Sequence, residues 1–181
     1  MSDEQLNTRK EILELLKDTL GHYATYHNHK ENVAWAGVAF FAALAIGAAT
    51  VMRDRLSDLS CASRAALSLV VVGACAVCSV YVSKQFALRK RAADLVAASI
   101  QLRARLTGDP SAPLNLPDWQ PPSGGISSGM QSTHVLPKAI LLAADSLGGA
   151  GQSSRKTLET CAYALLLGIA LLLLALIWTV G

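Results

Sequence analysis

Three histidines near the N-terminus have the side chains with the widest chemical range in this sequence. His22, His27 and His29 stand beside two tyrosines, and they are five, two and seven residues apart. Two metal ligands on one helix must lie three or four residues apart to reach the same ion. We therefore interpret the three histidines as a polar belt and expect no metal site. Imidazole titrates at about pH 6.5, so the belt is a candidate pH-sensitive element.

Four cysteines, Cys61, Cys75, Cys78 and Cys161, do not have the spacing of a disulfide framework. Cys75 and Cys78 form a Cys-x-x-Cys motif, but the motif lies inside an apolar run. Redox chemistry at such a motif needs a thiolate, which forms in a hydrated, electropositive site. We favour the other interpretation, that both residues are small, polarisable packing groups.

Other catalytic patterns are missing from the sequence. It contains no phosphate-binding glycine loop, no nucleophile elbow and no pair of metal-binding carboxylates. We therefore expect no catalytic residues, no cofactor and no enzymatic activity. The net charge of +3 also argues against a nucleic-acid partner, because phosphate binding needs a clustered basic surface.

Three apolar runs, 33–52, 65–83 and 160–180, dominate the chain, and none of them contains Asp, Glu, Lys or Arg. About 20 apolar residues cross the hydrocarbon core as an α-helix, and each run is close to that length. Lipid offers no partners for backbone polar groups, so a single run can satisfy them only as a helix. We predict an all-α integral membrane protein with three transmembrane helices, the last being a leucine-rich C-terminal anchor.

Two amphipathic segments, 3–31 and 84–107, adjoin the first two spans. Their apolar residues repeat at three and four, the spacing of a coiled-coil seam. We predict a helical hairpin over 3–107 that includes a long cytoplasmic antiparallel helix pair, whose stripes face each other or neighbouring subunits. Alternatives are a break at Gly21, or two helices lying on the membrane surface. The stripes are Leu13, Leu16, Leu20, Tyr23 and His27, and Leu88, Ala92, Leu95, Ser99, Leu102 and Leu106.

The segment 108–156 is rich in Pro, Gly and Ser. Such a composition buries little apolar surface, so we expect a linker with little fixed structure. A short amphipathic helix is predicted over 137–147, opened by Pro137 and closed by Gly148. It is expected either to lie on the inner membrane face or to dock on the helical hairpin, and Trp119 is a further candidate contact.

The distribution of Lys and Arg predicts the orientation of the spans, because cytoplasmic loops carry the excess of these residues. The connector between the first two spans has three arginines, whereas eight basic residues lie on the other side: Lys17, Lys30, Lys84, Arg89, Lys90, Arg91, Arg155 and Lys156. This asymmetry favours a cytoplasmic N-terminus and a periplasmic C-terminus. The basic run at 89–91 is interpreted as an anchor on the inner face, with binding of anionic lipid as the alternative.

Small residues give the first span a candidate packing face. Ala39, Ala43 and Gly47 are spaced by four residues, and helices in lipid associate where small side chains let backbones approach closely. The partner of this face is expected to be another span of the same chain or a second copy.

The second span has a mildly polar stripe at Ser68, Cys75 and Ser79. In an oligomer this stripe could line a narrow pore. The simpler interpretation is that these side chains fill helix contacts and bond to carbonyls, because no charged residue marks an ion pathway.

The layout of residues 3–107 resembles the SLATT-type two-span effector domains of bacterial conflict systems. The resemblance comprises a polar helix, two spans with a short connector, and a long helix that begins Lys-Gln-Phe-Ala-Leu-Arg-Lys-Arg at residue 84. It implies a membrane-perturbing or pore-forming module of the bacterial inner membrane that halts the cell during phage attack. The third span and the proline-rich segment depart from this layout.

Our first hypothesis is accordingly a non-enzymatic homo-oligomer in the bilayer whose cytoplasmic helices receive a signal from a soluble signalling or defence partner. The alternative is a membrane scaffold or anchor subunit that recruits a soluble partner through its cytoplasmic helices. A scaffold that depends on its partner should be inert when it is expressed alone.

Overall fold

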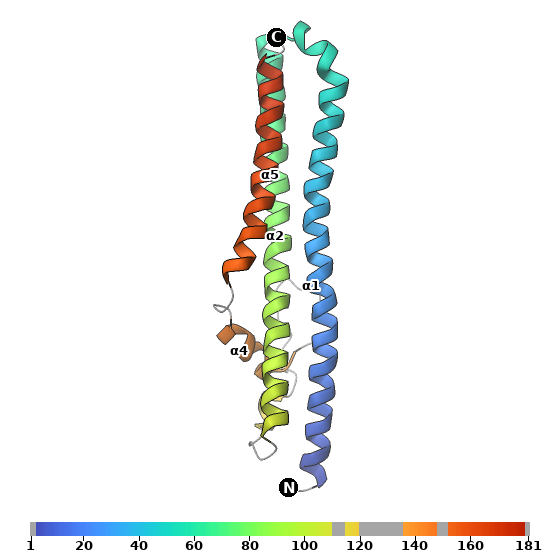
Figure 1. The fold of residues 1–181 in the computed structure, drawn as a ribbon, viewed down its shortest axis with the longest axis vertical. Coiled ribbons are helices and arrows are strands. Elements are labelled where there is room, and N and C mark those ends of the chain that lie inside the picture. The colour runs from blue at the N-terminus through green and yellow to red at the C-terminus, as the bar shows by residue number, and fades with distance from the viewer. Residues whose placement is uncertain (1–2, 110–114, 120–135, 148–151, 180–181) are drawn as a thin grey trace. The chain divides into compact units, whose positions relative to one another are not determined.

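The computed structural model describes residues 3–109, 115–119, 136–147 and 152–179, and within these ranges every regular element is helical. Figure 1 shows their order along the chain. The elements are α1 (Asp3–Met52), the 3-10 helix η1 (Arg53–Asp58), α2 (Cys61–Gly108), α3 (Leu116–Trp119), α4 (Lys138–Leu147) and α5 (Gln152–Thr179).

The chain divides into two compact units. Unit 1 comprises Met1–Asn28 and Arg89–Ala150, and unit 2 comprises His29–Leu88 and Gly151–Gly181. Helices α1 and α2 each contribute one segment to each unit. Each unit has its own hydrophobic core. The segments that α1 and α2 contribute to unit 1 bury one set of apolar side chains, and the segments that they contribute to unit 2 bury another.

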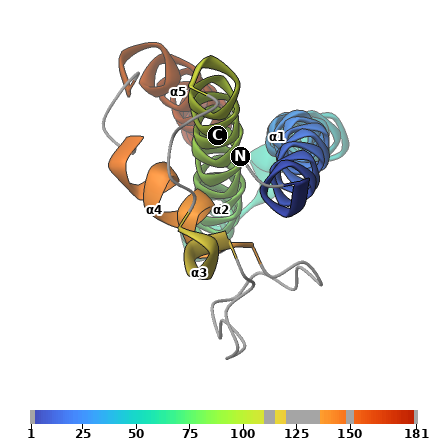
Figure 2. The ribbon, with the colours of Figure 1, turned by 90° about the horizontal axis from the view of Figure 1, so that it is seen from below.

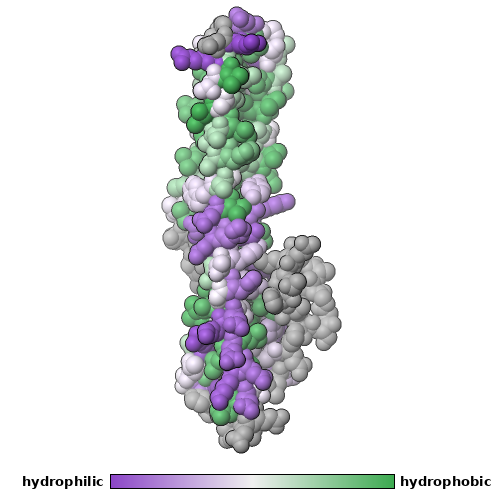
Figure 3. All heavy atoms as spheres, turned by 90° about the vertical axis from the view of Figure 1, so that its right-hand side faces the viewer, coloured by the Kyte–Doolittle hydropathy of each residue, from purple (hydrophilic) through white to green (hydrophobic). Residues whose placement is uncertain are grey.

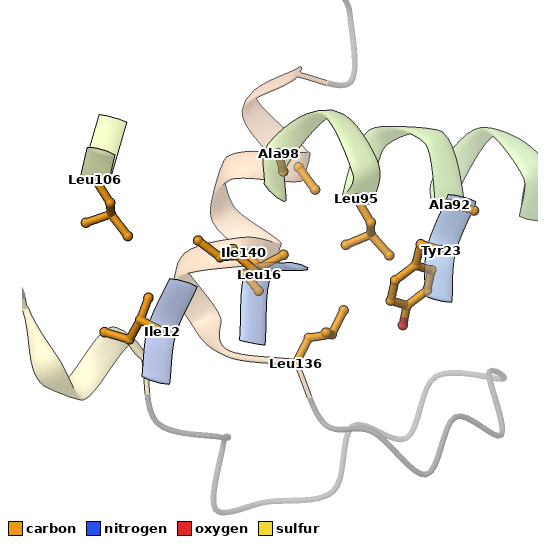
Figure 4. Close-up of a cluster of buried hydrophobic side chains, with 10 residues drawn as sticks. Ile12, Leu16, Tyr23, Ala92, Leu95, Ala98, Leu106, Leu136 and Ile140 are labelled. Carbon is orange, nitrogen blue, oxygen red and sulfur yellow. The ribbon is translucent and has the colours of Figure 1, made fainter. Parts of the chain in front are cut away.

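The core of unit 1 joins the two predicted stripes. Leu16 and Tyr23 of α1 are buried against Leu95 of α2, and the smaller Ala92 and Ala98 let the helices approach. Figure 4 shows these side chains converging from the two helices. Ser99 lies in the same interior, where its hydroxyl donates a hydrogen bond to the carbonyl of Leu95 at 2.8 Å. The prediction that the stripes face each other therefore describes the packing within unit 1.

Helix α4 completes this core. Leu136, Ile140 and Ala144 are buried in the same cluster, and Trp119 of α3 packs against it. Figure 2 shows α4 lying beside the part of α2 that belongs to unit 1. The short helix was predicted either to lie on the inner membrane face or to dock on the helical hairpin, and in the structure it docks on the helix pair. The helix begins after Pro137, whose carbonyl accepts hydrogen bonds from the N–H groups of residues 140 and 141 at 3.1 and 3.3 Å.

A buried arginine stabilises the end of α2. The guanidinium of Arg9 donates hydrogen bonds to the carbonyl oxygens of Leu106, at 2.9 Å, and Asp109. These carbonyls lie where the last turn of a helix leaves acceptors without backbone donors, and where the helix dipole favours a positive charge. Arg9 thereby ties the first turns of α1 to the last turn of α2.

The connector of unit 2 is short and well bonded. Leu56 of η1 is buried, and its carbonyl accepts a hydrogen bond from Arg64 at 3.0 Å. Ser60 is the N-cap of α2, because its hydroxyl oxygen accepts the N–H of Ser63 at 3.2 Å. These bonds turn the chain directly from α1 into α2.

Helix α1 runs without a break through Gly21, where an added side chain would meet nothing within 4 Å, so the predicted alternative of a break is wrong. Helix α2 begins at Cys61, before the predicted start of the second span at residue 65. Helix α5 begins at Gln152, before the predicted start of the third span at residue 160. Most of the proline-rich stretch lies outside the described residues.

Candidate functional site: the apolar helices of unit 2

Among the residues that the structure describes, three helices are long and apolar enough to cross a membrane. The qualifying segments are Leu6–Met52 in α1, Cys61–Gly108 in α2 and Lys156–Thr179 in α5. This number agrees with the predicted three spans and is consistent with a multi-pass membrane protein.

The surface of unit 2 is strongly apolar. Figure 3 shows a mainly hydrophobic face over the second half of α1 and hydrophilic side chains over its first half. Large apolar side chains are exposed on all three helices: Phe40, Leu44, Ile46, Val51, Leu69, Val70, Val77, Leu167, Leu171 and Leu172. Soluble proteins rarely expose so much contiguous apolar surface, whereas a lipid-facing surface requires it.

Inside unit 2, α2 packs between α1 and α5. Val38 and Phe41 of α1 and Leu166 and Ala170 of α5 belong to one buried cluster with Val82 of α2. Figure 1 shows α5 running beside the part of α2 that belongs to this unit. Helix α5 is therefore a packed member of the helix bundle in unit 2.

The two cysteines of the Cys-x-x-Cys motif contact different helices. The Cys75 thiol lies 3.7 Å from the carbonyl oxygen of Leu166 in α5, and the Cys78 thiol lies 3.5 Å from that of Gly37 in α1. These S–H···O contacts are weak, but they place both thiols in helix interfaces. This placement agrees with the packing role predicted for them.

Helices α1 and α2 approach each other closely at Gly37. A Cβ at Gly37 would lie 3.2 Å from each of two ring carbons of Tyr81 and 3.5 Å from a methyl carbon of Val82. Glycine thus makes room for an aromatic ring from the facing helix. Gly37 was not among the predicted packing residues, although a glycine within an apolar run is a signal of close helix approach.

The predicted small-residue stripe occupies another part of α1. Ala39, Ala43 and Gly47 are all exposed in the chain, and an added side chain at Gly47 would meet nothing within 4 Å. The residues that α1 buries against its own chain are instead Ala34, Val38, Phe41 and Ala45. The stripe is thus not covered by another helix of the same chain, and the other expected partner is a second copy.

The predicted polar stripe of α2 lies partly against α5. Ser68 donates to the carbonyl of Arg64 at 2.9 Å and accepts a hydrogen bond from the indole N–H of Trp178 at 3.1 Å. Cys75 packs against the buried cluster, and Ser79 is half-buried. These contacts correspond to the simpler interpretation of the stripe, in which Ser and Cys fill helix contacts.

The three histidines lie on α1 with local contacts. The His22 ring is exposed and packs edge-on against Tyr23, with ring centroids 5.1 Å apart. His27 has a ring nitrogen 3.2 Å from the side-chain oxygen of Asn28, and His29 is exposed. Among the described residues, no group of three His, Cys, Asp or Glu side chains is placed to hold a metal ion.

Comparison with protein-family models, with curated proteins and with solved structures gives no match to this chain.

Proposed function

We propose that the chain is a multi-pass protein of the bacterial inner membrane that self-associates through α1 and perturbs the membrane as an effector. The observation that carries this proposal is the exposed small-residue stripe of Ala39, Ala43 and Gly47 within an apolar surface. Small residues at a four-residue spacing let two helices approach closely in lipid, where packing drives association. Phe40 and Leu44 border the stripe and offer large side chains to a facing helix.

The internal packing of unit 2 supports this choice of surface. The side of α1 that carries Val38 and Phe41 is already covered within the chain. Helix α5 similarly engages Ser68 and Cys75, so a pore lined by the predicted polar stripe would require α5 to move away from α2. We therefore propose that assembly begins at the α1 stripe, and that any rearrangement of α5 follows it.

Unit 1 is proposed to be the cytoplasmic, signal-receiving part. What supports this is its polar surface and a core built from α1, α2 and α4, which needs no lipid to bury its apolar side chains. The resemblance of residues 3–107 to SLATT-type effector domains supports a role in defence against phage. In this arrangement the N-terminus is cytoplasmic and the C-terminus periplasmic, following the excess of Lys and Arg.

Replacing Gly47 by Leu is expected to weaken self-association by about tenfold, because the larger side chain separates the helix backbones. The measurement is the concentration-dependent mass of the detergent-solubilised chain, by sedimentation. Gly73→Leu on α2 is the matched control, since neither glycine has an atom within 4 Å of an added Cβ. An oligomer mass that is the same in both variants and in the unmodified chain would refute assembly through the stripe.

A membrane scaffold for a soluble partner is the second candidate. The observation that favours it is a set of large apolar side chains that unit 1 leaves exposed: Leu6, Leu15, Ile100 and Leu142. A scaffold differs from an effector in being inert when expressed alone.

A further inference from the structure

We propose that unit 2 binds one anionic phospholipid in a groove between α1 and α2, with an acyl chain in the groove and the phosphate at its lysine-bearing end. The inference rests on the proposed membrane location of this unit. It adds a specific lipid ligand to that proposal.

The groove is apolar along its whole length. Its volume is about 650 Å³, within the range of roughly 300–1,000 Å³ that is typical of small-ligand sites. Small residues, including Ala36, Gly37 and Ala74, lie between larger ones such as Phe40 and Tyr81. Such a trough accepts a narrow hydrocarbon chain.

The length of the groove matches one leaflet of a bilayer. Its lining on α1 runs from Val33 to Leu44, and on α2 from Ala74 to Tyr81. At about 1.5 Å per residue, the α1 side is roughly 16 Å long and the α2 side roughly 10 Å. The hydrocarbon core is about 30 Å thick, so the groove fits within one leaflet, where one acyl chain runs.

Cationic side chains stand at one end of the groove only. Lys30 precedes Val33 by three residues and Lys84 follows Tyr81 by three, so helical spacing places both lysines on the groove side of their helices. Both lie at the end where the apolar spans meet polar sequence. An ammonium group at this depth attracts the phosphate of an anionic lipid.

The test measures phospholipid retained by the full chain. The chain is reconstituted in vesicles of phosphatidylglycerol and phosphatidylcholine and extracted in mild detergent, and bound lipid per chain is counted by native mass spectrometry. We expect the unmodified chain to retain phosphatidylglycerol. The Ala74→Phe variant, whose added ring fills the groove, should lose most of the bound lipid. Lys30→Gln and Lys84→Gln should each weaken retention about fivefold. The controls Ala76→Phe and Lys90→Gln, at exposed positions outside the groove, should retain lipid normally.

Equal lipid retention by Ala74→Phe and Ala76→Phe would overturn the proposal, as would retention of phosphatidylcholine and phosphatidylglycerol in the proportion of the vesicle. A change of oligomer mass in Ala74→Phe with unchanged lipid would also overturn it, in favour of a second copy in the groove. Two other results would show separately that the proposed function fails. One is extraction of the chain from the membrane by alkaline carbonate, and the other is an oligomer mass that Gly47→Leu does not change.

Discussion

Ile140→Asp is expected to release α4 from the core of unit 1. Ile140 is fully buried among side chains of α1 and α2, so the variant would place a carboxylate in an apolar interior. Loss of the buried isoleucine together with the desolvated charge should cost about 4 kcal/mol or more. An acid in the first turn suits the helix itself, so the effect reports docking. The measurement is hydrogen exchange of the α4 amides in the full-length chain in detergent.

Leu142→Asp is the matched control for this prediction. Leu142 lies on the same helix, but 55% of it is exposed. The same substitution there should change exchange of the α4 amides by little. Equal protection of α4 in the two variants would show that α4 does not use Ile140 to dock.

Gly37→Leu is expected to destabilise the packing of α1 against α2. The added side chain would meet the Tyr81 ring, which an added Cβ alone already approaches to 3.2 Å. Overpacking of this kind costs about 1–3 kcal/mol, which lowers the melting temperature by roughly 2–12 °C relative to a chain with the same substitution at an open helical position. Thermal unfolding in detergent, followed by circular dichroism, measures the shift.

Gly73→Leu controls for the change of residue type. Both substitutions replace a helical glycine by leucine and should gain helix propensity equally, by about 1 kcal/mol. Only Gly37 has a facing side chain, whereas nothing lies within 4 Å of an added Cβ at Gly73. A Gly37→Leu chain as stable as the Gly73→Leu chain would contradict the close approach.

The local helical features were predictable from sequence because their signals are local. The repeat through Leu16 and Tyr23 and the repeat through Leu95 and Leu106 specify buried faces before any partner is known. Pro137 similarly marks the start of α4. The sequence left open where α4 docks, because its apolar face suits a membrane surface as well as a helix pair.

The contacts inside unit 2 were harder to predict. The first span contains eight alanines and two glycines, so small residues occur on every side of α1 and do not identify the side that packs within the chain. The position of Tyr81 on α2 decides that Gly37 is a point of close approach, and this is a long-range relation. The engagement of Ser68 by Trp178 likewise depends on where α5 packs, which no local repeat specifies.

The most direct test of the proposed function is membrane potential in bacteria that express this chain alone, followed with a voltage-sensitive dye. We predict that the unmodified chain and Gly73→Leu depolarise the cells, and that Gly47→Leu, expressed to the same level in the membrane, does not. An unchanged potential with all three chains, or equal depolarisation by all three, would contradict an effector that assembles through the exposed stripe of α1.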